Sequence, residues 1–417
     1  MTPARLALAV LLLLAAPRTA GASVADVFGL GSPFVAAGNA GAAEAADFSA
    51  CFLDPAGLAF AARPSLALGY ALADARISAD HGAVELEHAG GAVVGLSVPL
   101  DLPVAWLPRL AFGLALYAPP DVVVAIRGRP PQEPALPYYD RLARWLVLPS
   151  VALRLPGGVA LGAALDVFAG IRGPLEITDG PTGAVEGRAA LELFGTVTPI
   201  VGLRWEPFPW LSFGATYRAE FAAPASTIAR AEAGGASVRL EASIDGLFRP
   251  HTVVLGAAVR GARWRLALDV DWQRWSAFRD ALFDVSAELQ GVGLDPAALE
   301  LPFRDSFGVR LGGEYRIALR NAVFAVRAGY GFQSRILPEG TTGAALLDGD
   351  KHVLSTGLGL RLPLDDGSVL TLDLHLAAHL LAGASAVVPS TTDGAADRTV
   401  TAEGAVLATG FQLGVEW

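Results

Sequence analysis

Apolar residues alternate with small or polar residues along most of this sequence, and that alternation most limits how the chain can fold. In the stretch FGVRLGGEYRI, an extended backbone places Phe307, Leu311 and Tyr315 on one face and Arg310 and Glu314 on the other. Apolar residues make up 53% of the sequence, yet beyond the N-terminus no uninterrupted run reaches the roughly 20 apolar residues that a membrane-spanning helix needs. The chain is therefore predicted to be all-β.

The strand faces that lack large apolar side chains are rich in glycine and alanine. Gly162 and Ala164, for example, alternate with Leu161, Leu165 and Val167. A soluble sandwich would turn such a face to water, where strands rarely carry so much Gly and Ala. A transmembrane barrel turns its large apolar face to lipid and the other face to the lumen. The pattern favours a transmembrane antiparallel β-barrel.

About fourteen segments show this pattern, and single-chain bacterial barrels have an even number of strands. The segments run approximately over 64–78, 83–99, 109–119, 142–156, 158–173, 187–205, 210–225, 236–259, 263–275, 303–317, 322–334, 351–363, 368–386 and 399–417. Short connections rich in turn residues, such as Pro156–Gly158 and Asp365–Gly367, alternate with long ones over 119–141, 173–186, 276–302, 334–350 and 387–398. This alternation predicts short periplasmic turns and long extracellular loops.

The first residues have the layout of a secretory signal: Arg5, the apolar run LALAVLLLLAA and the small-residue step Ala20-Gly21-Ala22. We expect a signal peptide over 1–22 and a mature chain from Ser23. The whole chain has 31 basic and 41 acidic residues, a net charge of −10. Such an acidic chain is a poor candidate for binding nucleic acid, which requires clustered basic groups. The single cysteine, Cys51, rules out an internal disulfide.

The C-terminal stretch GFQLGVEW alternates and stops on an aromatic residue. Its apolar positions are Phe411, Leu413, Val415 and Trp417. This pattern resembles the assembly signal of outer-membrane barrels, so the barrel-assembly machinery and outer-membrane lipid are expected partners.

The stretch GNAGAAEAADFSACFLDPAGLA, which begins at Gly38, resembles the N-terminal signature of the FadL/TodX outer-membrane transporters of fatty acids and hydrocarbons. In that family a Gly-Asn-Ala-Gly run leads to Asn-Pro-Ala. The stretches DVDWQRWSAF, FRDSFGVRLGGEYRI and RAGYGFQSRILP resemble its later strands. The chain departs from the family at Asp54, where Asn is usual, and after Ser334, where a proline is expected. The resemblance implies a monomeric barrel, without a cofactor, in the outer membrane of a Gram-negative bacterium.

The resemblance also implies that the residues before the first strand form a plug inside the barrel. Gly and Ala let a backbone pass close to the barrel wall, and an Asp-Pro step fixes a turn. The expected division is a plug over 23–62 and a barrel over 63–417; the alternative is a disordered N-terminal arm. The plug residues singled out are Phe34, Asn39, Gly41, Phe52, Asp54, Pro55 and Ala56.

Charged side chains on the predicted lumen face should mostly be paired and structural. An arginine that faces the plug could hold a ligand carboxylate through charge-assisted hydrogen bonds. The candidate ligand-binding residues are Arg218, Arg310, Arg327, Arg361, His375 and His379. The two histidines share a strand face but lie ~13 Å apart at ~3.3 Å per residue, so no shared metal ion is predicted.

Enzyme signatures are scarce. The sequence has no Gly-x-Ser-x-Gly elbow, and its only lysine, Lys351, follows Asp350 rather than the glycine of a phosphate loop.

The predicted function is passive uptake of hydrophobic small molecules, which the outer loops capture and a plug rearrangement releases. The alternatives are a structural or surface-interaction barrel without transport, a polar-solute porin, and a barrel hydrolase.

Overall fold

The computed structural model describes residues 24–80, 82–83, 89–104, 109–120, 145–172, 175–179, 185–189, 192–233, 236–278, 284–289, 292–294, 301–342, 347–388 and 396–417 of the chain. The predicted signal peptide over 1–22 lies outside these residues, as does most of the long connection over 119–141.

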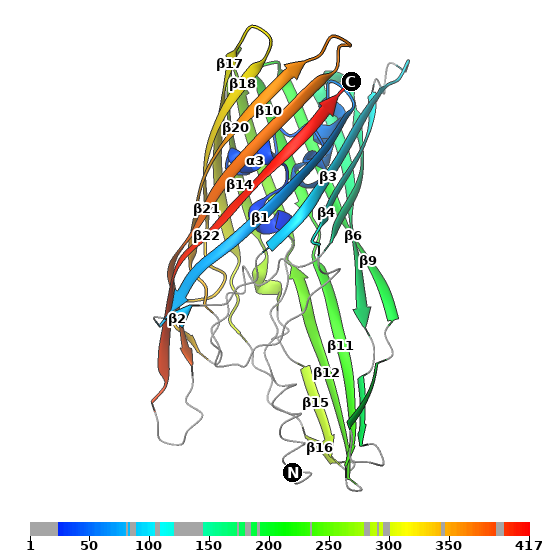
Figure 1. Ribbon diagram of the computed structural model, residues 1–417, viewed down its shortest axis with the longest axis vertical. Helices are drawn as coiled ribbons and strands as arrows, with labels where there is room; N and C mark the ends of the chain where they lie inside the picture. Colours follow the sequence, from blue (N-terminus) through cyan, green and yellow to red (C-terminus); the bar gives the residue numbers. More distant parts are fainter. Residues whose placement is uncertain are drawn as a thin grey trace.

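Fourteen antiparallel strands close into a barrel (Figure 1). They are β1 (Ser65–Ala79), β3 (Ala89–Asp101), β4 (Arg109–Ala118), β5 (Leu146–Arg154), β6 (Val159–Arg172), β9 (Glu192–Phe208), β10 (Leu211–Arg218), β13 (Thr252–Arg260), β14 (Trp264–Gln273), β17 (Ser306–Ala318), β18 (Val323–Gln333), β20 (Asp350–Pro363), β21 (Val369–Val388) and β22 (Arg398–Glu416). Each barrel strand pairs with the next, and β22 closes the ring on β1 from Ser65 opposite Glu416 to Ala79 opposite Ala402. The predicted barrel of about fourteen strands is confirmed.

Large apolar side chains lie on the outside of the barrel. Leu68, Leu255 and Leu311 are 53%, 53% and 51% exposed, whereas inward positions of the same sheet carry small or charged residues. An exposed apolar belt of this kind is suited to lipid and not to water. Phe411 and Leu413 of β22 and Trp417 after it are exposed, and Val415 lies opposite Leu66 and Leu370. The C-terminal alternation is thus present, while its role in assembly stays a prediction.

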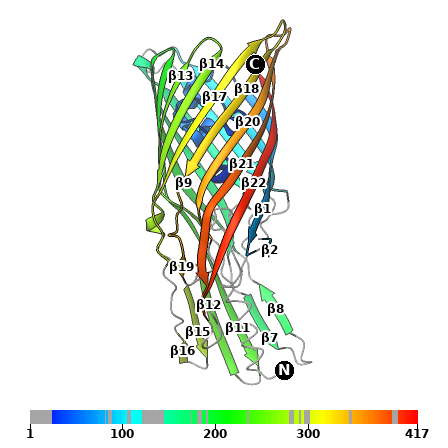
Figure 2. The ribbon, with the colours of Figure 1, turned by 90° about the vertical axis from the view of Figure 1, so that its left-hand side faces the viewer.

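A second sheet continues from the barrel at the end opposite the C-terminus (Figures 1 and 2). It has six strands in the order β16, β15, β12, β11, β7 and β8. Their bounds are β7 (Leu175–Asp179), β8 (Val185–Ala189), β11 (Phe221–Ala233), β12 (Ala236–Arg249), β15 (Asp284–Leu289) and β16 (Val292–Leu294). The short strands β2 (Gly82–Ala83) and β19 (Thr341–Thr342) extend the barrel sheet.

This second sheet corrects the predictions for two strands and for two connections. The predicted strand over 236–259 is two strands in different sheets, separated at Pro250, which has no N–H to donate to a ladder. The strand predicted over 210–225 leaves the barrel after Arg218. The connections over 173–186 and 276–302, expected to be loops, contain strands of the second sheet. Alternation shows that a segment is extended but does not show which sheet it joins.

The residues before β1 lie inside the barrel as short helical turns (Figure 1). These are α2 (Val24–Phe28), α3 (Ser32–Ala36), α4 (Ala50–Leu53) and η1 (Pro55–Phe60); η2 (Pro156–Gly158) and η3 (Trp275–Ala277) are turns elsewhere in the chain. We call residues 24–61 the N-terminal segment. None of the helices in the described part of the chain is long and apolar enough to span a membrane.

The N-terminal segment approaches the wall so closely that two wall positions require glycine. A Cβ atom on Gly214 would lie 2.0 Å from the Ala42 carbonyl oxygen, and one on Gly329 would lie 2.1 Å from the Gly38 nitrogen. Glycine allows this approach because it has no side chain. The Gly-rich inward face therefore serves to seat the N-terminal segment against the strands.

Candidate functional site inside the barrel

The second half of the N-terminal segment, residues 41–61, is held by side chains of the wall. One carboxylate oxygen of Asp269 accepts hydrogen bonds from the Gly41 and Ala42 nitrogens at 2.9 and 3.0 Å. The Ser212 hydroxyl donates to the Ala43 carbonyl at 2.8 Å. Gly41, predicted as a plug residue, therefore lies at the point where β14 fixes the segment.

Charged groups hold the end of the same half. Arg204 donates to the Ala45 carbonyl at 2.7 Å. The Phe60 ring lies beneath two guanidinium groups, with its centroid 4.5 Å from that of Arg154 and 4.7 Å from that of Arg204. Such cation–π contacts stabilise an aromatic ring where cations lie close to its face.

Asp54 starts the helical turn η1. Its Oδ1 accepts a hydrogen bond from the Ala56 nitrogen at 3.1 Å, and Pro55 occupies the first turn, where a missing N–H costs nothing. Asp54 belongs to the N-terminal segment and not to a spanning strand, and it is fully buried. Burial raises the pKa of its carboxyl to about 7, and the opposing charge of Arg204 limits the rise.

The wall side chains that hydrogen-bond to the first half, residues 24–40, are neutral. The Ser32 nitrogen donates to Gln412 Oε1 at 3.1 Å, and the Ser32 hydroxyl lies 3.0 Å from His375 Nδ1. The Gly38 nitrogen donates to the Ser355 hydroxyl at 2.9 Å.

Asn39 links two parts of the first half to each other. It has a left-handed backbone with φ of 59°, and its side-chain amide donates to the Phe28 carbonyl at 3.1 Å. Phe28 in turn meets the His379 ring edge-on, with centroids 4.9 Å apart. Both predicted histidines therefore contact this half.

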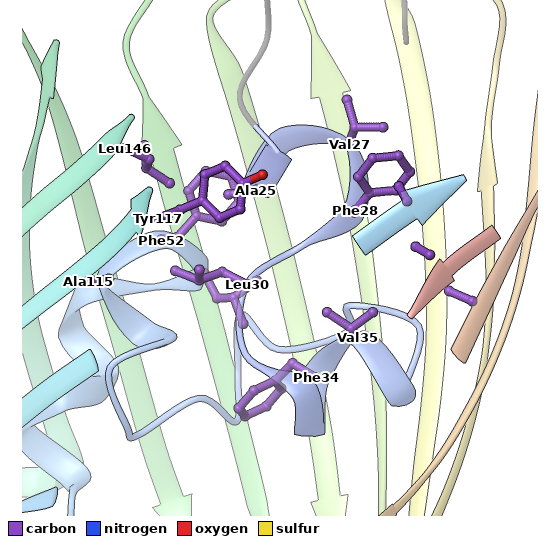
Figure 3. Packing of buried hydrophobic residues seen from close by; sticks show 14 of the residues in the cluster. Ala25, Val27, Phe28, Leu30, Phe34, Val35, Phe52, Ala115, Tyr117 and Leu146 are labelled. Carbon is purple, nitrogen blue, oxygen red and sulfur yellow. The ribbon is translucent and has the colours of Figure 1, made fainter. Parts of the chain in front are cut away.

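Two cavities flank the first half of the N-terminal segment. The apolar cavity, lined by Phe28, Leu30, Val35, Tyr117 and Phe411 among others, has an empty volume of about 570 Å³, counting space open to the rest of the lumen. Figure 3 shows Leu30, Val35 and Phe28 of the segment with Tyr117 and Leu146 of the wall, all members of one buried cluster.

The polar cavity lies on the other side of the first half and has an empty volume of about 1000 Å³ on the same basis. Ala25 and Gly29 line both cavities, so helix α2 and the turn after it separate them.

Four cationic side chains line the polar cavity: Arg218, Arg249, Arg310 and Lys351. Three are ion-paired: Arg249 with Asp166 at 2.7 Å, Arg310 with Asp271 at 2.8 Å and Lys351 with Asp348 at 2.7 Å. The opposite charge of Asp26, which lines the same cavity, acts on Arg218, as does that of Asp271. Arg218 also donates to the Phe52 carbonyl at 3.2 Å and lies 4.2 Å from the Phe52 ring centroid.

The other predicted arginines lie elsewhere. Arg327 is buried between Glu314 and Asp373, at 2.6 Å from each. Arg361 is at the short-turn rim, paired with Glu416 at 2.6 Å and with its side chain 45% exposed. Neither is among the residues that line the two cavities.

The predicted histidines and Phe34 contact other groups inside the barrel. His375 lines the apolar cavity and His379 the polar one. Phe34 is buried, with the Arg265 guanidinium 5.4 Å from its ring centroid. Within the described residues, no group of three or more His, Cys, Asp or Glu side chains is arranged to hold a metal ion.

The sequence profile of the family described as outer membrane protein transport protein (OMPP1/FadL/TodX) matches residues 197–416. The chain belongs to this family. As a member of the OMPP1/FadL/TodX family with a closed barrel, it is a protein of the Gram-negative outer membrane. Comparison with curated proteins gives no match.

Solved structures share the fold at low sequence identity. A Pseudomonas aeruginosa FadL homologue matches with a TM-score of 0.55 at 16% identity, covering 96% of this chain and 98% of that one. The toluene transporter TbuX of Ralstonia pickettii matches with a TM-score of 0.55 at 15% identity, covering 93% and 98%. The toluene transporter TodX of P. putida matches with a TM-score of 0.54 at 15% identity, covering 94% and 99%.

Proposed function

We propose that this OMPP1/FadL/TodX family member is a channel through which hydrophobic small molecules, fatty-acid-like or hydrocarbon-like, diffuse inward across the outer membrane. In this proposal the N-terminal segment is the plug, and its rearrangement releases the ligand. The observation that carries the proposal is the pair of cavities that line the first half of that segment and share Ala25 and Gly29. Passive diffusion requires no cofactor and no catalytic step.

Capture from outside begins at an aromatic cluster next to the polar cavity. Phe248, Trp275, Phe278 and Phe303 pack with ring centroids 4.6 to 6.3 Å apart, and Trp275 also lines the cavity. Because these residues lie where the long outer connections meet the strands, an apolar ligand that enters there reaches Arg218 next. In this proposal Arg218 binds the anionic head of a ligand, which competes there with the charge of Asp26.

The structural or surface-interaction alternative has one observation in its favour, the six-stranded sheet beyond the barrel. The two functions differ in what they require of the lumen. A surface-interaction barrel does not depend on Arg218, whereas a channel for anionic amphiphiles does.

The test is palmitate uptake into proteoliposomes that contain the mature protein. Arg218→Ala should reduce saturable uptake ~10-fold or more, since a hydrogen bond to a charged group contributes ~1.5 to 3 kcal/mol. Arg218→Lys should retain part of it. Arg361→Ala, at the rim, is the matched control and should leave uptake unchanged. Equal uptake by the wild type and Arg218→Ala would exclude the head-group role, and no uptake by any variant would favour the structural alternative.

The remaining proposed partners are those that assemble the barrel and the lipid that surrounds it. β22 both closes the ring on β1 and ends on exposed Trp417, whose nitrogen donates to the Pro64 carbonyl at 3.2 Å. We propose that the assembly machinery recognises this strand and that outer-membrane lipid covers the apolar belt of the finished monomer.

A further inference from the structure

Two tyrosine–histidine pairs lie on the outer face of the barrel wall, near the end that carries the long connections. In the first pair the Tyr217 hydroxyl lies 2.7 Å from His251 Nδ1, and in the second the Tyr330 hydroxyl lies 2.8 Å from His352 Nδ1. The ring centroids of the two pairs are 5.9 and 6.1 Å apart. Both tyrosines face outward, where they are 39% and 40% exposed. The wall therefore presents the same arrangement of two side chains twice.

The second pair lies at the edge of the apolar belt. Tyr330 is on β18 and His352 is on β20, two strands that pair along their length (Figure 2). Leu354, the next outward residue of β20, is exposed to lipid. Asp350, on the other side of His352, is paired with Arg335 at 3.4 Å. A polar ring between apolar and charged residues lies at the level of the lipid head groups, where amphipathic rings are enriched.

The two pairs differ in what faces the second ring nitrogen of the histidine. The Glu220 nitrogen donates to His251 Nδ1 at 3.2 Å, so Nδ1 is an acceptor and the proton of the neutral ring is on Nε2. The Glu220 carboxylate lies 3.7 Å from that Nε2. Within the described residues, no carboxylate lies within 4 Å of His352 Nε2. The second pair thus repeats the first without its anion.

We propose that His352 binds a phosphate group of a lipid in the surrounding leaflet. Tyr330 donates to Nδ1 and orients the ring, so that Nε2 carries the proton and donates to a phosphate oxygen. A hydrogen bond to an ionised acceptor is roughly twice as strong as a neutral one. The lipid is a phosphorylated glycolipid of the lipid A type, because such lipids form the outer leaflet of a Gram-negative outer membrane.

The first pair is closed to such a lipid. The Glu220 carboxylate already faces His251 Nε2, and its negative charge repels a phosphate from the same position. One barrel therefore has one phosphate site, at His352, although it has two tyrosine–histidine pairs. The site lies on the outer face of the wall, so this proposal does not depend on the proposed uptake function.

Native mass spectrometry of the mature protein in nonionic detergent, titrated with bisphosphorylated lipid A, tests the site. The wild type should retain one tightly bound lipid. His352→Phe keeps a ring next to Phe332 but has no N–H, and it should bind lipid A about tenfold more weakly, since one hydrogen bond to a charged group is lost. Tyr330→Phe should weaken binding about threefold, because the histidine ring loses the group that orients it. His352→Ala gives the same readout should the larger ring prevent folding.

The first pair supplies the matched controls. His251→Phe should leave lipid A binding unchanged, because Glu220 occupies that position in the wild type. Glu220→Ala should add a second bound lipid, and His251→Phe in the same chain should remove it again. All of these variants should stay heat-modifiable, as expected for surface substitutions on a folded barrel.

Equal affinity of the wild type and His352→Phe for lipid A would overturn the proposal. Equal retention of lipid A and its dephosphorylated form would also overturn it, since the apolar belt alone would then hold the lipid. Displacement of lipid A by an equal concentration of inorganic phosphate would assign the site to a free anion instead. A Glu220→Ala barrel that still bound one lipid would contradict the closed first pair. Palmitate uptake by His352→Phe should equal that of the wild type, so this proposal and the uptake function can fail separately.

Discussion

The two halves of the N-terminal segment lie in the same lumen but are held there differently. In the second half, backbone groups of seven residues bond to wall side chains, most of them charged: Gly41 and Ala42 to Asp269, Ala43 to Ser212, Ala45 to Arg204, Phe52 to Arg218, Leu53 to Thr216 and Ala61 to Arg109. In the first half the hydrogen-bond partners in the wall are the neutral side chains of Gln412, Ser355 and His375, and the charged Arg265 lies over the Phe34 ring. Hydrogen bonds to charged groups are roughly twice as strong as neutral ones.

The backbone conformations of the two halves also differ. Gly29, Gly31 and Gly38 in the first half have positive φ angles of 88°, 85° and 67°, whereas no residue over 41–61 has one. The first half also lines both cavities. The neutral hydrogen bonds, the left-handed turns and the lining of both cavities therefore coincide in the first half. We expect the first half to be the part that moves and the second half to be a fixed floor.

The largest expected effect comes from displacing the floor. Gly214→Val places side-chain atoms where the Ala42 carbonyl lies, since even a Cβ would be 2.0 Å from that oxygen. Filling a packed interior costs ~1 to 3 kcal/mol, enough to shift a plug between seated and unseated states. We expect a folded barrel with a large increase in small-ion conductance in planar bilayers.

The matched control is Gly313→Val, which meets the end of the Leu266 side chain at 3.0 Å and not the N-terminal segment. Its conductance should equal that of the wild type. If Gly214→Val conducted no more than this control, the second half would not be the floor of the lumen.

A smaller change in conductance is expected from displacing the first half alone. A Cβ on Gly329 would lie 2.1 Å from the Gly38 nitrogen, so Gly329→Val should push residues 24–40 away from β18. Because the floor remains seated, conductance should rise less than in Gly214→Val. Palmitate uptake should fall strongly, since both cavities lose a wall. Equal conductance in the two variants would remove the distinction between the halves.

The barrel could be predicted from sequence because successive residues of a strand face lipid and lumen in turn, so large apolar residues alternate with small or charged ones. Each barrel strand therefore appears in the alternation, including β17 with its outward Leu311 and inward Glu314. The second sheet could not be recognised, since its strands have the same period. Pro250, between β12 and β13, marks one of the places where the chain passes from one sheet to the other.

The site was harder to predict than the fold because ion pairing depends on contacts distant in sequence. Arg218 and Arg327 look alike on the inward face, yet the acids that neutralise Arg327 come 13 residues before it and 46 residues after it. Glu44 of the N-terminal segment, which pairs with Arg260 and Arg265, was not predicted at all. It lies in a stretch that was interpreted for its small residues, and its partners are on β13 and β14.

The smallest expected effect is a pH dependence of conductance, caused by the protonation of Asp54 in the second half. Its pKa is raised to about 7 by burial while the segment is seated, and the ordinary value of 3.8 returns when the carboxyl reaches water. A group with a raised pKa in the seated state stabilises that state at low pH, and this stabilisation is lost as the pH rises through about 7. Wild-type conductance should therefore increase modestly from pH 6 to pH 8, because Arg204 and Arg218 favour the charged carboxylate and offset part of the effect.

Asp54→Asn keeps an acceptor oxygen for the Ala56 nitrogen but has no proton to lose, so its conductance should be flat over this range. A pH profile that is the same in the wild type and Asp54→Asn would show that another group is responsible, and the comparison of the two halves would then rest on their hydrogen bonds and backbone alone.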